Sequence, residues 1–354
     1  MTRSPARRRS RPAVVAATLL ALGLLAAACG GDDDDTASPD TEAASQTGGA
    51  DDAGGAPDLS GVTLRVGDQV NLAKTLLEAS GQLDDARYDI EWTSFAAGPP
   101  LLEAINADAI DIGGVGDTPP IFAQAAGTPF KIVGASQGAD DDASSLAIVV
   151  PEGSDIEELS DLEGKKLAYT EGSAANYLVL KALEEADLGI DDVEPVPLLP
   201  PDGLAAFTGG DVDAWAVWDP FVALAEAQGG TILATGAGLV PGYGFQVARA
   251  GALDDEALTA AIGDYLLRLQ AAAQWAIDHQ DEWADLYAGL TDLEPEVVSK
   301  TLDRFQAAYV PLDDDIVAAQ QDEADTFFDA GLIPDEIDVA DIFDTRFADS
   351  LAGT

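Results

Sequence analysis

The stretch GDTPPIFAQAAG, residues 116–127, marks a tight turn followed by a helix. A Thr before two prolines is typical of a first helical turn, and a glycine after an apolar run is typical of a helix end. A helix is therefore predicted over 119–126, directly after a buried strand over 110–115. The first backbone amides of this helix have no acceptor within it, so they are available to a ligand beside Asp117 and Thr118.

The same alternation extends in both directions from this turn. Further strands are predicted at 62–67, 88–93, 130–135, 146–150, 166–169, 194–198, 213–217, 231–234 and 244–249. Further helices are predicted at 70–80, 99–107, 174–187, 202–208 and 220–228. From residue 253 the pattern is helical only, with helices expected at 254–279, 281–289, 294–308, 313–330 and 338–344. This order favours an α/β fold with mostly parallel sheets flanked by helices and an all-helical C-terminal part.

Two lobes are predicted from the positions of two long apolar segments. Residues 59–145 together with 241–350 form lobe I, and residues 146–240 form lobe II. The segments 144–154 and 242–250 would cross between them. A double crossing of this kind creates a hinge with a cleft, where ligands often bind.

The N-terminal segment is expected to be an export signal rather than part of the fold. Residues 1–28 combine five arginines with a short apolar run that ends in small residues before Cys29. This pattern predicts a secretory signal peptide and lipidation of Cys29, the only cysteine; ordinary cleavage nearby is the alternative. Residues 29–58 carry nine carboxylates and no basic residue, so they are predicted to be a disordered acidic tether.

The charge excludes several classes of partner. The 354 residues include 65 acidic and 17 basic side chains, for a net charge of −48. Such a surface repels nucleic acid and anionic lipid headgroups, so contact with a membrane is expected only through the lipid anchor. An anionic ligand can still be held by backbone amides at helix N-termini, which need no Lys or Arg.

Four predicted strand-to-helix junctions share this chemistry. They are FAAGPPLLEAI (95–105), GVGDTPPIFA (114–123), TEGSAANYLV (170–179) and AVWDPFVAL (216–224). Ligands of α/β proteins bind outside the carboxyl ends of strands, where such junctions converge. One junction alone would be structural, because Pro and Ser begin many helices, whereas four together indicate an anion site.

Alternation along DAWAVWDP places Trp215 and Trp218 on opposite faces of a strand, and Trp218 beside Asp219 is expected to face the cleft.

Two enzyme patterns fail on their context. GASQG (134–138) resembles a nucleophile elbow but precedes no helix, and the single histidine, His279, lies on a polar helix face. With one His and one Cys, no metal site or cofactor is expected.

The segments 94–134, 67–69 (GDQ), 167–188 and 206–221 closely resemble the aliphatic sulfonate-binding proteins of bacterial ABC importers, within the wider taurine, sulfonate and nitrate group. The resemblance runs from about residue 62 to 345. It implies a two-lobed periplasmic binding protein of type II, a clamshell that closes on its ligand. The resemblance and the junctions together give these expected ligand-binding residues: Gln69, Gly98, Gly116, Asp117, Thr118, Gly172, Ser173, Asn176, Trp218 and Asp219.

The function implied is that of a monomeric, non-enzymatic lipoprotein on the outer face of the cytoplasmic membrane. It would deliver a small sulfonate or related organic anion, or a zwitterion, to an ABC permease and its ATPase. Taurine, nitrate or another small metabolite is an alternative ligand, because Ala174 and Ala175 stand where sulfonate-binding relatives often carry hydroxyls. Two other classes stay open: a pyrimidine-synthase-like enzyme, disfavoured by the signal and the single His, and a binding module for a membrane sensor.

Overall fold

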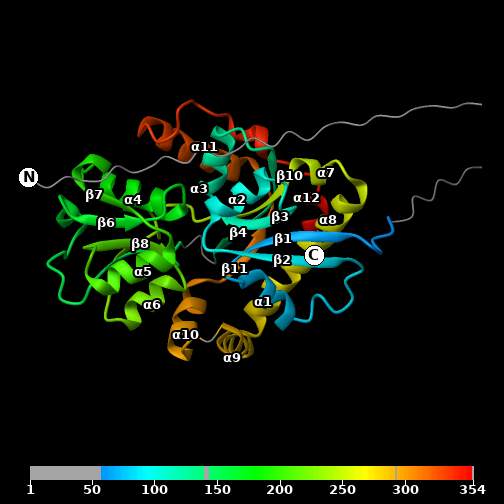
Figure 1. The fold of residues 1–354 in the computed structure, drawn as a ribbon, viewed down its shortest axis with the longest axis horizontal. Coiled ribbons are helices and arrows are strands. Elements are labelled where there is room, and N and C mark those ends of the chain that lie inside the picture. Colours follow the sequence, from blue (N-terminus) through cyan, green and yellow to red (C-terminus); the bar gives the residue numbers. More distant parts are fainter. Residues whose placement is uncertain (1–56, 139–142, 292, 353–354) are drawn as a thin grey trace, which may run out of the picture. The chain divides into compact units, whose positions relative to one another are not determined.

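The computed structural model describes residues 57–138, 143–291 and 293–352, in which the strands form two separate sheets (Figure 1). The first sheet has the order β11-β4-β10-β3-β1-β2. Its strands are β1 (Thr63–Gln69), β2 (Asp89–Phe95), β3 (Ile112–Gly116), β4 (Phe130–Gly138), β10 (Gly244–Arg249) and β11 (Ala307–Val310). The second sheet has the order β7-β6-β8-β5-β9. Its strands are β5 (Leu146–Val150), β6 (Lys166–Tyr169), β7 (Glu194–Pro197), β8 (Ala214–Trp218) and β9 (Thr231–Thr235).

Most strands run in one direction within each sheet, as the sequence predicts. In the first sheet β1 pairs parallel with β2 and β3, whereas β10 lies antiparallel between β3 and β4. In the second sheet β6 pairs parallel with β7 and β8, whereas β5 lies antiparallel between β8 and β9. The two inserted strands, β5 and β10, coincide with the segments predicted to cross between lobes. The sheets are therefore mixed in their pairings.

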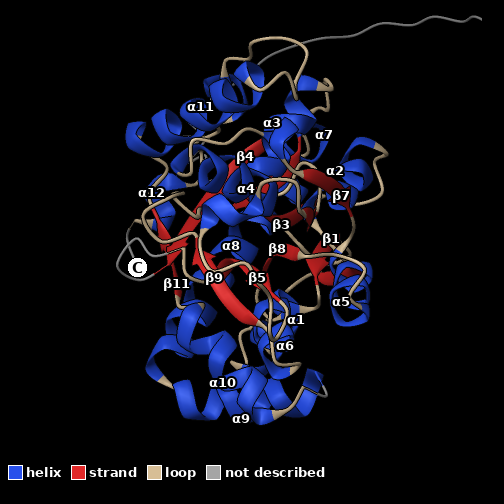
Figure 2. Ribbon diagram, turned by 90° about the vertical axis from the view of Figure 1, so that its left-hand side faces the viewer, coloured by secondary structure: helices blue, strands red, loops and turns tan. Residues whose placement is uncertain are grey.

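Helices surround the strands of both sheets (Figure 2). The helices that alternate with strands are α1 (Leu72–Ala79), α2 (Gly98–Asn106), α3 (Thr118–Ala125), α4 (Ala174–Glu185), α5 (Pro200–Gly209) and α6 (Phe221–Ala227). The later helices are α7 (Ala250–Leu253), α8 (Glu256–Asp278), α9 (Gln280–Thr291), α10 (Pro295–Arg304), α11 (Asp314–Asp329) and α12 (Ala348–Leu351). Short 3₁₀ turns occur at Leu159–Leu162, Ile190–Asp192 and Val339–Ile342. None of the helices in these described ranges is both long and apolar enough to cross a membrane.

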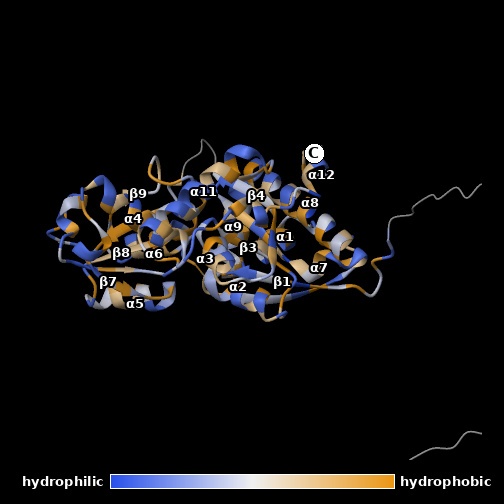
Figure 3. Cartoon of the chain, turned by 90° about the horizontal axis from the view of Figure 1, so that it is seen from above, coloured by the Kyte–Doolittle hydropathy of each residue, from blue (hydrophilic) through white to orange (hydrophobic). Residues whose placement is uncertain are grey.

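Each sheet buries apolar side chains on both faces. In the first sheet, Leu64 and Ile112 pack with Tyr265 of α8 on one side, whereas Ile132 packs with Ile105 of α2 on the other. In the second sheet, one cluster packs against α4 and a second, around Trp215, packs against α5 and α6. Figure 3 shows that the helices carry hydrophobic and hydrophilic residues side by side, as helices with one buried face do.

Local chemistry explains the turn at 116–127. The Asp117 carboxylate accepts a hydrogen bond from the Thr118 amide, and two prolines occupy the first turn of α3. The helix begins at Thr118, one residue earlier than predicted. Gly127 has a φ of 78°, a left-handed conformation that costs glycine little, and it ends the helix as predicted.

The prediction for the C-terminal part is wrong in one place. The helix expected over 294–308 ends at Arg304, and residues 307–310 form strand β11, which pairs antiparallel with β4. Tyr309 and Val310 favour strands, and the pairing adds an edge to the first sheet. The predicted signal peptide, Cys29 and nearly all of the tether lie outside the described residues.

The C-terminal helices contact elements of both sheets. Helix α10 packs against α6, and α9 packs against α1 (Figure 1). On α11, Phe327 packs against Phe122 of α3 and Tyr177 of α4, with ring centroids 4.9 and 5.9 Å apart. The C-terminal segment is therefore in contact with strand-to-helix junctions of both sheets.

Candidate functional site

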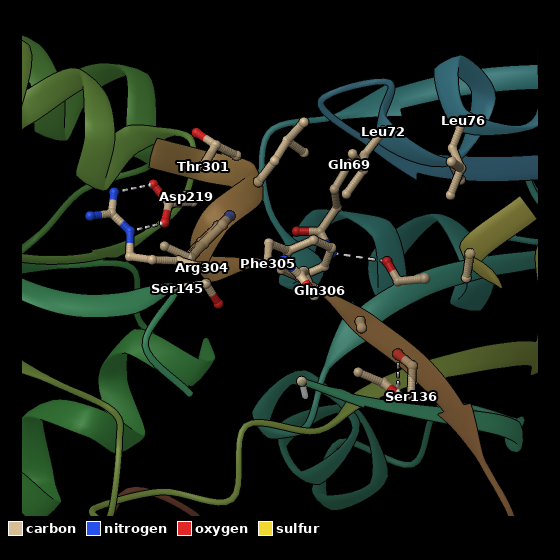
Figure 4. A pocket seen from close by; sticks show the side chains of 18 of the residues that line it. Gln69, Leu72, Leu76, Ser136, Ser145, Asp219, Thr301, Arg304, Phe305 and Gln306 are labelled. Carbon is tan, nitrogen blue, oxygen red and sulfur yellow. Dashed lines mark hydrogen bonds and ion pairs between the residues drawn. The ribbon is translucent and has the colours of Figure 1, made fainter. Parts of the chain in front are cut away.

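A cavity of about 420 Å³ lies at the ends of several strands (Figure 4). Its walls come from the end of β1, the turns after β3 and β8, the start of α4, the loop before β10, and helices α1, α8, α9 and α10. The first four are carboxyl-end positions of α/β strands or helix starts, where ligands of such folds bind.

Six of the predicted site residues line this cavity. They are Gln69, Gly98, Gly116, Ser173, Trp218 and Asp219. The Gln69 amide donates to the Gly114 carbonyl at 2.9 Å, which fixes the direction of its side chain. Trp218 is half-buried at the end of β8, whereas Trp215 is fully buried in the core.

The start of α4 offers backbone donors to the cavity. The Ser173 side chain does not cap the helix; its hydroxyl donates instead to the Thr170 carbonyl at 2.6 Å. No side chain of the described residues accepts from the first amides of α4, at Ala174 and Ala175. Because such amides carry partial positive charge, this helix start suits an anion.

The other four predicted residues, Asp117, Thr118, Gly172 and Asn176, are not among the residues that line this cavity. Asp117 and Thr118 are buried at the start of α3, and Asn176 is buried in α4. The Asn176 side-chain oxygen accepts from the Gly172 amide at 3.1 Å, and the φ of Gly172, 68°, makes this bend possible. These residues shape the turns that carry Gly116 and Ser173. In the sequence, a side chain that caps a helix has the same signature as one that binds a ligand.

Asp117 joins three segments of the chain. Its carboxylate accepts from the amides of Thr118 and Tyr243, both at 3.1 Å, and its carbonyl accepts from the Gln320 amide at 2.8 Å. Burial raises the pKa of Asp117 to about 6, although the backbone hydrogen bonds lower it. The turn is therefore tied to the loop before β10 and to α11.

Glu323 of α11 was not among the predicted residues. It is 0% exposed, one carboxylate oxygen accepts from the Thr118 hydroxyl, and the other has no partner among the described residues. Burial and the nearby Asp117 carboxylate raise the pKa of Glu323 well above its usual range. Both effects favour the protonated form of Glu323, which lies against the turn at 116–118.

Glu323→Gln should flatten the dependence of stability on pH. A carboxyl whose pKa is raised on folding stabilises the fold fully below its unfolded pKa, and this contribution is lost as pH rises through the folded value. The amide cannot ionise, so the variant should lose less stability between acidic and alkaline pH, by about 1.4 kcal/mol for each unit of pKa shift removed. The measurement is the free energy of unfolding in urea across that range. Asp329→Asn, at an exposed position on the same helix, is the matched control and should leave the profile unchanged; a wild-type profile in Glu323→Gln would contradict the assignment.

The main residue that the sequence interpretation missed is Arg304, at the end of α10. It is the only Lys or Arg among the described residues that line the cavity. Its Nε and Nη2 donate to the Asp219 carboxylate at 2.7 and 2.9 Å (Figure 4). Its Nη1 donates to Glu226 at 2.8 Å. Burial raises the pKa of Asp219 more than the Arg304 guanidinium lowers it. The Asp219 carboxylate is thus already paired with a cation of the protein itself.

The structure gives no support to the hydrolase pattern. Residues 134–138 of GASQG lie within β4, not on a strand-to-helix turn. His279 ends α8, where its ring stacks on Trp275 at 5.2 Å, and it does not line the cavity. Within the described ranges no group of His, Cys, Asp and Glu is arranged to hold a metal ion.

Comparison with known proteins shows that the chain is similar to transport proteins. Residues 88–295 match a family of periplasmic phosphonate substrate-binding proteins of ABC transporters, over more than half of the chain. A protein of Escherichia coli K12 named for binding aliphatic sulfonates is 36% identical over 289 residues, which cover 80% of this chain and 89% of the relative. A protein of Bacillus subtilis 168 with the same name is 34% identical, over 80% of this chain and 86% of the relative. The alkanesulfonate-binding protein of Xanthomonas axonopodis pv. citri, solved bound to MOPS, has a TM-score of 0.76 at 34% identity; the match covers 81% of this chain and 99% of that one.

Proposed function

Because the chain belongs to the periplasmic substrate-binding proteins of ABC transporters, we propose that it captures a small sulfonate or related organic anion for an importer. The observation that carries this proposal is the similarity to sulfonate-binding proteins over nearly all of the described fold, together with a cavity at the same strand-to-helix junctions that carry the similarity. The role requires recognition and release, and no bond is made or broken.

The anionic group is held by uncharged donors in this proposal. Ser173 and Ala174 at the start of α4 line the cavity together with Gln69, whereas the Arg304 guanidinium is engaged by Asp219 and Glu226. Amide dipoles at a helix start can stabilise a sulfonate without a Lys or Arg side chain. Trp218 would form an apolar wall beside it.

Capture involves closure of two lobes in this proposal. The lobes comprise residues 59–145 with 241–350 and residues 146–240, which correspond to the strands of the first and second sheets. A ligand bound between them favours the closed state because it contacts both lobes only there. The closed form would dock on the permease, whose ATPase supplies the energy for import.

The protein would act outside the cytoplasmic membrane as a monomer anchored by a lipid on Cys29. Support comes from the sequence of residues 1–58, with its basic start, apolar run and acidic segment. The acidic tether would extend through charge repulsion and hold the folded part away from the membrane surface.

A ligand panel tests the proposal. Alkanesulfonates, taurine, sulfate, nitrate and pyrimidine precursors are each titrated into the protein by calorimetry and by thermal unfolding. A true ligand at a hundredfold excess over its Kd should stabilise the fold by about 2.7 kcal/mol. Sulfonates are expected to bind; silence from every sulfonate alongside binding of another class would overturn the substrate assignment.

A further inference from the structure

Phe305, between α10 and β11, is an aromatic residue that lines the cavity and is not covered by the protein. It is 43% exposed, whereas every other Phe, Tyr and Trp of the sequence, all of them within the described ranges, is buried or half-buried. Three other large apolar residues are exposed, and none of them lines the cavity: Leu199, Leu286 and Leu290. Single exposed apolar side chains are common on outer surfaces, but one on a cavity wall is available to a ligand.

The backbone at Phe305 is held on both sides. Its amide donates to the Thr301 carbonyl at 2.9 Å, at the end of α10. The preceding residue, Arg304, donates to the Asp219 carboxylate, and β11 begins two residues later and pairs with β4. Figure 4 shows Phe305 next to Arg304 among the side chains that line the cavity. Because this segment is already ordered, a ligand that covers the ring would have little additional chain to order.

One ion pair connects Phe305 with Trp218, the other incompletely buried aromatic residue named in the site. Trp218 precedes Asp219 at the end of β8, and Phe305 follows Arg304 at the end of α10. The Asp219 and Arg304 side chains are joined by two hydrogen bonds, at 2.7 and 2.9 Å. In the two-lobe division proposed above, Trp218 belongs to residues 146–240 and Phe305 to residues 241–350. A ligand that touches both rings would therefore contact both lobes.

The cavity is larger than an anionic group requires. Its volume of about 420 Å³ lies within the range of pockets that hold drug-sized molecules, roughly 300–1,000 Å³. The helix start at α4 would hold only the anionic group, so the remaining space would take the organic part of the ligand. Aromatic side chains attract flat rings more strongly than aliphatic groups of equal size, because their quadrupoles favour offset-stacked and edge-to-face pairs.

We propose that Phe305 is a specificity-determining residue of the binding site and favours ligands whose organic part is a flat ring. Phe305 and Trp218 are two walls for that ring, and the Arg304–Asp219 ion pair positions both of them. This inference rests on the proposed function, because the anionic group of the ligand occupies the site at the start of α4. An aliphatic chain would bury apolar area against Phe305 but would form no ring pair.

The decisive experiment compares three sulfonates on the wild-type protein. Benzenesulfonate and cyclohexanesulfonate have the same number of carbons and the same charge, and methanesulfonate presents almost nothing but the anionic group. The Kd of each is measured by calorimetry at neutral pH. Benzenesulfonate should bind about fivefold more tightly than cyclohexanesulfonate, as expected for pairing with aromatic walls.

Two variants of Phe305 locate the preference. Phe305→Leu keeps an apolar side chain but removes the ring, so the preference for benzenesulfonate should fall to about twofold or less while cyclohexanesulfonate binds nearly as before. Phe305→Ala should weaken benzenesulfonate about tenfold and leave methanesulfonate within about twofold of the wild type. Leu290→Ala, at an exposed apolar position outside the cavity, is the matched control and should change none of the three Kd values.

The outcomes separate this inference from the proposed function. If sulfonates bind but the wild type does not prefer benzenesulfonate, or if Phe305→Leu keeps the full preference, Phe305 does not select for a ring and the proposed function stands. If Phe305→Ala weakens methanesulfonate as strongly as benzenesulfonate, Phe305 supports the anion site and the assignment of specificity is overturned. If no sulfonate binds the wild type, the proposed function and this inference are both overturned.

Discussion

Arg304→Met is expected to destabilise the fold by about 3–5 kcal/mol, the loss typical when one partner of a buried ion pair is removed. The Asp219 side chain is 1% exposed, and Arg304 gives it two hydrogen bonds while a third goes to Glu226. Met replaces most of the apolar volume of the arginine stem, so the variant removes the guanidinium but little packing. The remaining Asp219 carboxylate would be buried with only the Ala223 amide, at 3.1 Å, as a donor.

Urea unfolding at neutral pH measures this loss. Lys74→Met, which breaks the exposed pair with Glu78, is the control and should cost no more than about 1 kcal/mol. The double variant Arg304→Met with Asp219→Asn should recover much of the stability, because no buried charge is left. The loss should also shrink toward acidic pH, where Asp219 becomes neutral. A loss below that of the control at neutral pH would show that the Arg304 pair does not hold α10 to the turn after β8.

The architecture could be predicted because its signals are local. Most of the strands from β1 to β9 are separated by helices, and most of these helix starts carry Pro, Ser or Asp, signals that each span a few neighbouring residues. Strand β11 could not be recognised in this way. Its four residues follow α10 directly, and their extended conformation depends on pairing with β4, which lies far away in the sequence.

The site was predictable only in part, for the same reason. Gln69, Ser173 and Trp218 lie at strand ends or helix starts, which the sequence pattern marks. Arg304 comes from a helix 85 residues beyond Asp219, and no pattern within α10 indicates its partner. Glu323 reaches Thr118 across a still longer separation. Contacts of this kind are set by tertiary packing.

The distinction between capping and ligand binding also required the structure. Asp117 and Ser173 each precede a helix, and either residue type can cap a helix or face a ligand. In the structure the Asp117 side chain caps α3 and Asp117 does not line the cavity, whereas the Ser173 side chain does not cap α4 and Ser173 lines the cavity. Similar sequence signals thus produce a supporting role in one turn and a donor site in another.

Trp215 and Trp218 should separate stability from binding, because they lie three residues apart on one strand. Trp215 is 0% exposed and packs against Phe207 and Phe221, with ring centroids 5.9 and 6.1 Å away. A Cβ added at Gly203 would lie 2.6 Å from the Trp215 indole nitrogen, so the packing around this ring is tight. Trp215→Ala is therefore expected to destabilise the fold by about 3–5 kcal/mol.

Trp218→Ala should have the opposite profile. Its ring is half-buried at the cavity wall, so its removal should cost about 1 kcal/mol of stability, as is typical of point variants, but should weaken binding of the cognate ligand at least about tenfold. Urea unfolding and calorimetric titration are performed on both variants. For Trp215→Ala the ligand is added to saturation, so that the fraction of folded protein is known. If Trp215→Ala retains wild-type stability, the core packing is wrong. If Trp218→Ala binds every ligand as tightly as the wild type, the ligand does not occupy the cavity at the end of β8.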